Sequence, residues 1–122
     1  RTMIRNVTPD KMNAMVAAIG RYGMSLPAAS KKYGIVGYCW GGRVTYLAGC
    51  RTNNAAGVAY YGGGIAQLLG ETPRCPMMFH HGEKDMHIPQ SDVDAIRTAW
   101  REAGARVLEA GIDTEGLQVT TR

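Results

Sequence analysis

Apolar residues recur along this chain with two spacings, one typical of strands and one typical of helices. Three short apolar runs bounded by glycine or proline predict strands around residues 35–36, 57–61 and 77–80. Apolar residues three and four positions apart predict helices over residues 12–19, 43–48 and 93–103. Strands that alternate with helices in this way are typical of a mostly parallel α/β sheet with flanking helices.

Capping and turn-forming residues mark where these helices are expected to begin and end. Thr8-Pro9-Asp10 supplies a cap, a first-turn proline and an early acid for the first helix. Gly49 is expected to stop the second helix, and residues 23–32 are expected to form a loop or frayed turn. The last helix is expected to open at the Ser91/Asp92 cap region and to close near Gly104.

The run Gly37-Tyr38-Cys39-Trp40-Gly41 has the pattern G-x-C-x-G between a predicted strand and a predicted helix. The serine version of this pattern marks a nucleophile elbow, the strained turn on which a nucleophile stands. The flanking glycines are expected to give clearance where strand and helix pass closely, with Gly42 adding to it. At the start of a helix, the positive end of the helix dipole favours the reactive thiolate. The alternative is that Cys39 is an ordinary buried thiol.

Length, charge and cysteine content narrow the classes of function. The chain has 122 residues and a net charge of +4, and no apolar run approaches the ~18 residues that a membrane span needs. Its three cysteines have neither disulfide nor zinc-site spacing, which favours a reducing, cytoplasmic setting. Residues 1–51 hold eight Lys and Arg against one acid. These cations are dispersed and lack an aromatic platform, so a nucleic-acid surface is disfavoured, whereas an anionic substrate is compatible.

Several segments together resemble the dienelactone hydrolase (carboxymethylenebutenolidase) family of the α/β-hydrolase fold. The match in order and spacing runs from about residue 10 to residue 104. The segments that carry it are Gly37 to Gly42, Tyr60-Tyr61-Gly62, Pro76 to Asp85, and Ile88-Pro89. A cysteine in the elbow, followed by an H-G-x-x-D segment at residues 81–85, makes the resemblance specific.

The resemblance implies a Cys-His-Asp triad that hydrolyses small lactones or related esters through a thioester, with no cofactor and no metal. Cys39 matches the nucleophile, Asp85 matches the acid that orients the histidine, and the backbone N–H of Trp40 is implied as an oxyanion donor. Asp85 could instead be a turn-stabilising carboxylate.

No histidine matches the family's base. The segment Val107 to Gly111 is similar to the turn that carries this base in the family, but Ile112 follows it where a histidine is expected. His80, His81 and His87 are interpreted as structural or solvated side chains rather than as a relocated base.

The resemblance also implies one truncated α/β-hydrolase domain over residues 1–122, with residues 105–122 as a divergent tail. Such a unit exposes apolar sheet edges and is expected to pair with another copy of itself. Three hypotheses follow: a hydrolase impaired by truncation and by its missing histidine, a non-catalytic fragment or oligomerising interaction module, and a nucleotide-binding α/β domain. The last is disfavoured because no glycine run has the spacing of a phosphate loop.

Overall fold

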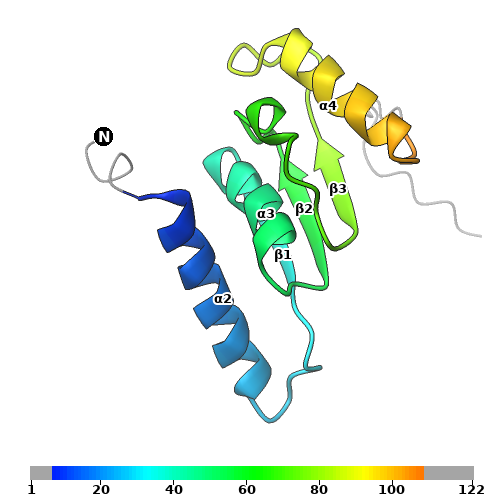
Figure 1. The fold of residues 1–122 in the computed structure, drawn as a ribbon. Helices are drawn as coiled ribbons and strands as arrows, with labels where there is room; N and C mark the ends of the chain where they lie inside the picture. Colours follow the sequence, from blue (N-terminus) through cyan, green and yellow to red (C-terminus); the bar gives the residue numbers. More distant parts are fainter. Residues whose placement is uncertain (1–6, 109–122) are drawn as a thin grey trace, which may run out of the picture.

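The protein is described by a computed structural model that covers residues 7–108. Within this range the chain forms one sheet of three parallel strands in the order β1-β2-β3 (Figure 1). The strands are β1 (Gly34–Tyr38), β2 (Ala56–Tyr60) and β3 (Met77–His80). All three lie where the sequence predicts them, within one to two residues, and the parallel α/β architecture is confirmed.

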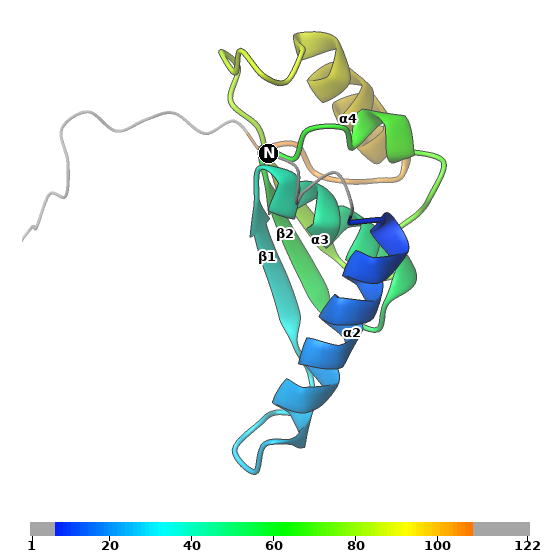
Figure 2. The same cartoon turned by 90° about the vertical axis from the view of Figure 1, so that its left-hand side faces the viewer.

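All the helices lie on one side of this sheet, as Figure 2 shows. They are α2 (Pro9–Ser25), α3 (Trp40–Arg51), the short 3-10 helix η1 (Ala66–Leu68) and α4 (Gln90–Glu102). Helix α3 packs directly on β1 and β2, whereas α2 packs on α3 and α4 packs on η1. No helix within residues 7–108 has the length and apolar character to cross a bilayer.

The predicted start of α2 is confirmed, but its end and its apolar face differ from expectation. The hydroxyl oxygen of Thr8 accepts a hydrogen bond from the N–H of Lys11 at 3.3 Å, and Pro9 is the first helical residue. The helix continues through Gly23 to Ser25, so the loop starts later than predicted. Of the apolar face, Met12 is buried, whereas Met15 and Ile19 are exposed; the main packing partner of α2 among the described elements is α3.

Gly49 does not stop α3, which continues to Arg51. Gly49 is buried inside the helix, and a Cβ atom on it would lie 2.9 Å from Sδ of Met77. The N–H of Arg74 also donates a hydrogen bond to the carbonyl oxygen of Gly49 at 2.9 Å. Close packing against the segment that leads into β3 therefore explains this glycine, and the prediction of a helix stop was wrong.

Helix α4 is amphipathic as predicted, but Ser91 and Asp92 do not cap it. Pro89 occupies the cap position, so both residues lie in the first turn, and no side chain caps the helix. Gly104 has φ +84° just after the helix end, which is typical of a C-terminal glycine and confirms the predicted close.

The core lies between the sheet and these helices. It is a cluster of buried side chains from α3, β2, the loop before η1, and α4, namely Tyr46, Cys50, Ala59, Ile65 and Ile96. The hydroxyl of Tyr46 donates to the carbonyl oxygens of Leu68 and Glu71, which anchors the η1 segment to α3. Trp100 of α4 stacks on Phe79 of β3, with ring centroids 5.4 Å apart. These contacts fix β3 and α4 against the helix that follows Cys39.

The other face of the sheet carries no helix from the described part of the chain. Apolar side chains of β1 and β3 remain open there, with Val36 57% exposed and Met78 50% exposed. At the carboxyl end of the strands, Tyr38, Tyr60 and His80 form a ladder of stacked rings, with centroids 4.9 and 4.4 Å apart. One face of the sheet thus belongs to the core, and the other is an exposed apolar surface.

Candidate functional site

Cys39 occupies the turn between β1 and α3 in a strained backbone conformation. It is the N-cap residue of α3, with φ +54° and ψ −122°, and its side chain is exposed. A non-glycine residue rarely adopts such angles, and they persist only where surrounding structure enforces them. Here the N–H of Cys39 donates to the carbonyl oxygen of Tyr60 at 3.0 Å. Its own carbonyl oxygen accepts from Gly42 N–H at 2.9 Å. The geometry is that of a nucleophile elbow.

This geometry requires a residue without a side chain at Gly37 and at Gly42. A Cβ atom on Gly37 would overlap the carbonyl oxygen of Gly41 and the hydroxyl of Thr45. A Cβ atom on Gly42 would lie 2.8 Å from the carbonyl oxygen of Tyr60. A Cβ atom on Gly41 would meet nothing within 4 Å, so the steric role expected of that glycine is wrong.

The backbone N–H of Trp40 is available to a ligand. Trp40 is the first residue of α3, and the first N–H groups of a helix have no partner within the helix. Within residues 7–108 no other acceptor is found for it. An unpaired N–H one residue after Cys39 is suited to bind an oxyanion that forms next to the sulfur.

Asp85 lies in the loop after β3, with its side chain 20% exposed. Its Oδ1 accepts a hydrogen bond from the backbone N–H of His87 at 2.8 Å, which is an Asx turn. The Nδ1 atom of His87 is 3.6 Å from the same oxygen, but that imidazole is 91% exposed. Asp85 is therefore held in place by its own loop, and His87 is a solvated side chain beside it.

The sequence predicts that His81 is a structural or solvated side chain. In the structure its imidazole is partly buried, and its ring nitrogens make no hydrogen bond to the described residues. It follows β3 directly, and both of its ring nitrogens are buried. Burial lowers the pKa of His81, the charge of Asp85 raises it in part, and His80 lowers it further. The signal that could have identified it is its position directly after β3, at the carboxyl end of the sheet.

The topology brings Cys39 and Asp85 to the same end of the sheet. Cys39 follows β1 and Asp85 follows β3, and both strands run parallel to β2, which lies between them. No hydrogen bond joins Cys39 to Asp85, His81 or His87 in the described residues. Ile112, at the position expected for the base, lies outside these residues.

The three thiols differ in their surroundings. All are unbridged, with Cys39 exposed, Cys75 half-buried and Cys50 buried. Burial, reinforced by the charge of Glu71, raises the pKa of Cys50 to about 11. Cys50 is therefore a protonated core thiol at neutral pH. Among residues 7–108 no three His, Cys, Asp or Glu side chains gather as metal ligands would.

Comparison with known proteins agrees with this geometry. Residues 1–108 match the family described as "Dienelactone hydrolase family". The chain is 34% identical over 88 residues to a "Putative carboxymethylenebutenolidase" of Methylorubrum extorquens, covering 63% of this chain and 30% of that protein. It is 35% identical over 71 residues to a carboxymethylenebutenolidase of Pseudomonas putida, covering 57% of this chain and 30% of that protein.

The fold also has a counterpart among solved structures. The crystal structure of a "Putative Dienelactone Hydrolase" from Klebsiella pneumoniae superposes with a TM-score of 0.72 at 26% identity. The superposition covers 84% of this chain and 47% of that one. The chain thus spans about a third of the length of the curated relatives it matches, and its α/β unit corresponds to part of a larger fold.

Proposed function

Because this chain belongs to the dienelactone hydrolase family, we propose that it carries the nucleophile of a cysteine hydrolase for small lactones or related esters. The observation that supports this most strongly is the strained, exposed Cys39 between β1 and α3. A buried structural thiol would need neither this backbone nor the exclusion of a side chain at Gly37.

In the proposed first step, the thiolate of Cys39 attacks the carbonyl carbon of the ester. The carbonyl oxygen becomes an oxyanion and accepts a hydrogen bond from the N–H of Trp40. The bond between the carbonyl carbon and the ester oxygen then breaks, and the leaving oxygen takes a proton from solvent. The acyl group remains on Cys39 as a thioester.

The second step is where we expect this chain to be impaired. Water must add to the thioester and expel the thiolate, which requires a base to take a proton from the water. The resemblance assigns Asp85 to orient a histidine, yet no histidine stands at the matching position. Because a general base typically contributes ~10²–10⁴-fold, we expect release of the acyl group to be slower by a similar factor than in a chain that has the base.

Kinetics with p-nitrophenyl acetate test this proposal directly. We expect a burst of at most one equivalent of nitrophenol, followed by a very slow steady state. Cys39→Ala should abolish the burst, whereas Cys75→Ala, the matched control for a half-buried thiol, should retain it. Asp85→Asn should behave like the parent. Sustained turnover that is lost in His81→Gln or His87→Gln would show that one of these histidines is the base.

The substrate and the setting are further parts of the proposal. Residues 1–51, which include α3, hold eight Lys and Arg against Asp10 alone, and this imbalance supports an anionic ester as substrate. Unbridged thiols support a reducing, cytoplasmic setting. The anionic substrate can be tested with two nitrophenyl esters at low salt, one that bears a carboxylate and its neutral analogue. A faster burst with the carboxylate ester would support the proposal.

A second candidate function is an oligomerising interaction module without catalysis. The observation that favours it is the open face of the sheet, where Val36 and Tyr38 are each 57% exposed. Contiguous apolar surface of this kind marks interaction sites in folded proteins. Because the sheet edges at β1 and β3 are also unpaired in the described residues, we propose a second copy of the chain as the partner.

A further inference from the structure

Tyr61, the first residue after β2, has a backbone conformation that a tyrosine rarely adopts. Its φ is +38°, in the left-handed region where a bulky residue is an outlier. The three residues that follow it are glycines, and of these only Gly64 has a positive φ. A glycine at position 61 would adopt the same angle without strain. Because strained residues cluster at functional sites, a tyrosine at this position requires an explanation.

The neighbouring backbone holds Tyr61 in this conformation. Its N–H donates a hydrogen bond to the carbonyl oxygen of His80 at 2.7 Å, which continues the pairing of β2 with β3. Gly62 packs closely on the start of α3, where a Cβ atom on it would lie 2.9 Å from the backbone nitrogen of Arg43. The chain is therefore fixed on both sides of Tyr61, and the direction in which its side chain leaves the backbone is preorganised.

This strained position is next to Cys39. Tyr38 pairs with Tyr60 in the sheet, and the N–H of Cys39 donates to the carbonyl oxygen of Tyr60 at 3.0 Å. Cys39 and Tyr61 therefore lie side by side at the carboxyl ends of β1 and β2. Two of the three non-glycine residues with a positive φ in the described part of the chain are thus neighbours at this edge.

Aromatic side chains gather around the exposed thiol. Tyr38 and Trp40 flank Cys39 in the chain and are 57% and 42% exposed, and Tyr61 is 43% exposed. The rings of Tyr38 and Tyr61 have centroids 6.4 Å apart and are tilted by 52°. Rings that are half exposed in this way can pack against a further aromatic ring, either stacked or edge to face.

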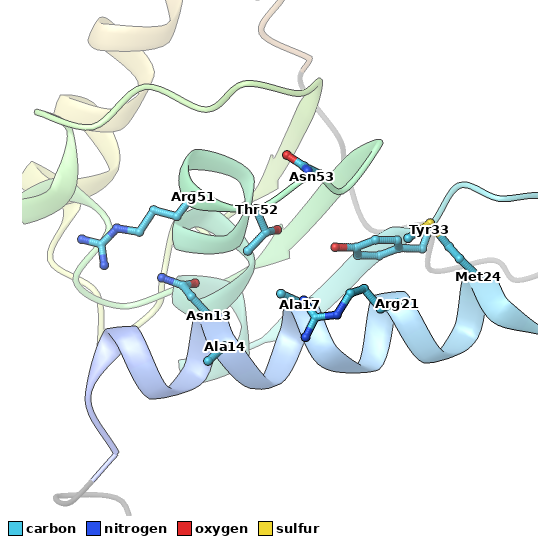
Figure 3. Close-up of a pocket in the computed structure, with 9 residues that line it drawn as sticks. All are labelled: Asn13, Ala14, Ala17, Arg21, Met24, Tyr33, Arg51, Thr52 and Asn53. Atoms are coloured by element: carbon cyan, nitrogen blue, oxygen red, sulfur yellow. The ribbon is translucent and has the colours of Figure 1, made fainter.

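The largest described hollow that α2 borders lies elsewhere in the fold. It has a volume of about 400 Å³ and is formed by α2 with the end of α3 (Figure 3). Tyr33 lines this hollow and precedes the amino end of β1, whereas Cys39 follows the carboxyl end of the same strand. A group attached to the carbonyl carbon at Cys39 therefore meets the aromatic rings and not this hollow.

We propose that Tyr61, together with Tyr38, binds an aromatic ring on the acyl group, so that the substrates of this site are aryl-substituted esters or lactones. This inference rests on the proposal that Cys39 is the nucleophile. The substrate's ring packs against Tyr61 while its carbonyl carbon lies at the sulfur of Cys39. Contacts between aromatic rings contribute more than the burial of the same apolar area, so the site discriminates between an aromatic ring and a saturated one.

Two thioesters of mercaptoethanesulfonate test this preference, one with a phenylpropionyl group and one with a cyclohexylpropionyl group. The thiolate of Cys39 attacks the carbonyl carbon of either probe, and mercaptoethanesulfonate leaves as a thiolate, so the leaving group carries no ring. Intact-mass spectrometry follows acylation, and each rate is divided by the rate with N-acetylcysteine. We expect the phenyl probe to react roughly 2- to 10-fold faster after this correction, although cyclohexyl is the larger apolar group.

Variants of Tyr61 assign the preference to its ring. Tyr61→Phe keeps the ring and should retain the ratio of the two corrected rates. Tyr61→Leu should bring this ratio close to one, and so should Tyr61→Gly, which removes the ring and relieves the backbone. Tyr22→Leu is the matched control, because Tyr22 is 69% exposed on α2, and it should leave the ratio unchanged. A purely structural role of Tyr61 would change both rates alike.

Equal corrected rates in the parent chain would overturn the aromatic surface and leave the hydrolase proposal intact. A preference for the phenyl probe that survives both Tyr61→Leu and Tyr61→Gly would have the same meaning. The hydrolase proposal fails separately if neither thioester nor p-nitrophenyl acetate acylates Cys39, and the present inference then fails with it.

Discussion

At the scale of single residues, the backbone is strained at Cys39, the residue proposed as the nucleophile. A residue held at such backbone angles costs about 1–3 kcal/mol, which the surrounding strand and helix must offset. Two backbone hydrogen bonds, to Tyr60 and from Gly42, hold the turn on both sides. These bonds hold Cys39 at the N-cap of α3, and its thiol is exposed there.

The first prediction concerns the reactivity of the three thiols. Limiting iodoacetamide near neutral pH should label Cys39 first, because it is exposed at a helix N-terminus. Cys50 should be labelled last, because its pKa of about 11 keeps it protonated and it is buried in the core. Peptide mapping by mass spectrometry measures the order. Preferential labelling of Cys50 or Cys75 in the folded chain would contradict the assignment of the elbow.

The second prediction concerns His81 and acid stability. Burial lowers its pKa below the ordinary value of 6.5, so the unfolded chain binds the proton more readily than the folded chain. The stability that depends on a neutral His81 is therefore present above about pH 6.5 and is lost as the pH falls below it. His81→Gln should reduce the slope of the unfolding free energy against pH just below pH 6.5.

The comparison for His81→Gln is the unsubstituted chain at the same pH values. Urea titrations at several pH values supply the measurement. Identical slopes for His81→Gln and the parent would mean that the imidazole is solvated in the folded chain.

At the scale of elements, the sequence predicted the strands correctly but did not predict where α3 ends or which residue caps α4. The strands were correctly placed, because β-branched and aromatic runs bounded by glycine or proline have few alternatives. Gly49 was misread as a helix stop because its reason is contact with Met77, more than twenty residues away in the chain. The Ser91/Asp92 cap was misplaced for a local reason, because Pro89 is the N-cap residue and α4 already begins at Gln90.

The third prediction separates the two glycines of the G-x-C-x-G pattern. Gly37→Ala should destabilise the chain by about 1–3 kcal/mol, because its methyl group would overlap Gly41 and Thr45. Gly41→Ala should be neutral or stabilise α3 by up to about 1 kcal/mol, because alanine favours helix and the space is open. Urea unfolding measures both. A similar loss in the two variants would show that Gly41 also contributes to the packing of the elbow.

At the scale of the whole molecule, the parallel topology explains which parts of the site the sequence could predict. Cys39 and Asp85 each follow a strand of one parallel sheet. Chain order alone therefore predicts that both lie at the carboxyl end of that sheet. The burial of both ring nitrogens of His81 depends on how separate elements pack, and the sequence shows only that this residue directly follows a strand. The bare face of the sheet likewise becomes visible only when every helix is found on the other side (Figure 2).

The last prediction concerns this bare face. The described unit corresponds to 47% of a solved relative, and the open face of its sheet, where Val36 and Met78 are exposed, is the surface on which we expect association with a second copy. Met78→Lys places a charge on the β3 side of this face and should shift the chain toward monomer. Met86→Lys is the matched control, because Met86 is 93% exposed in the loop after β3 and carries the same change. Light scattering across a concentration series gives the mass. A parent that stays monomeric, or equal effects of the two variants, would exclude the sheet face as the self-association surface.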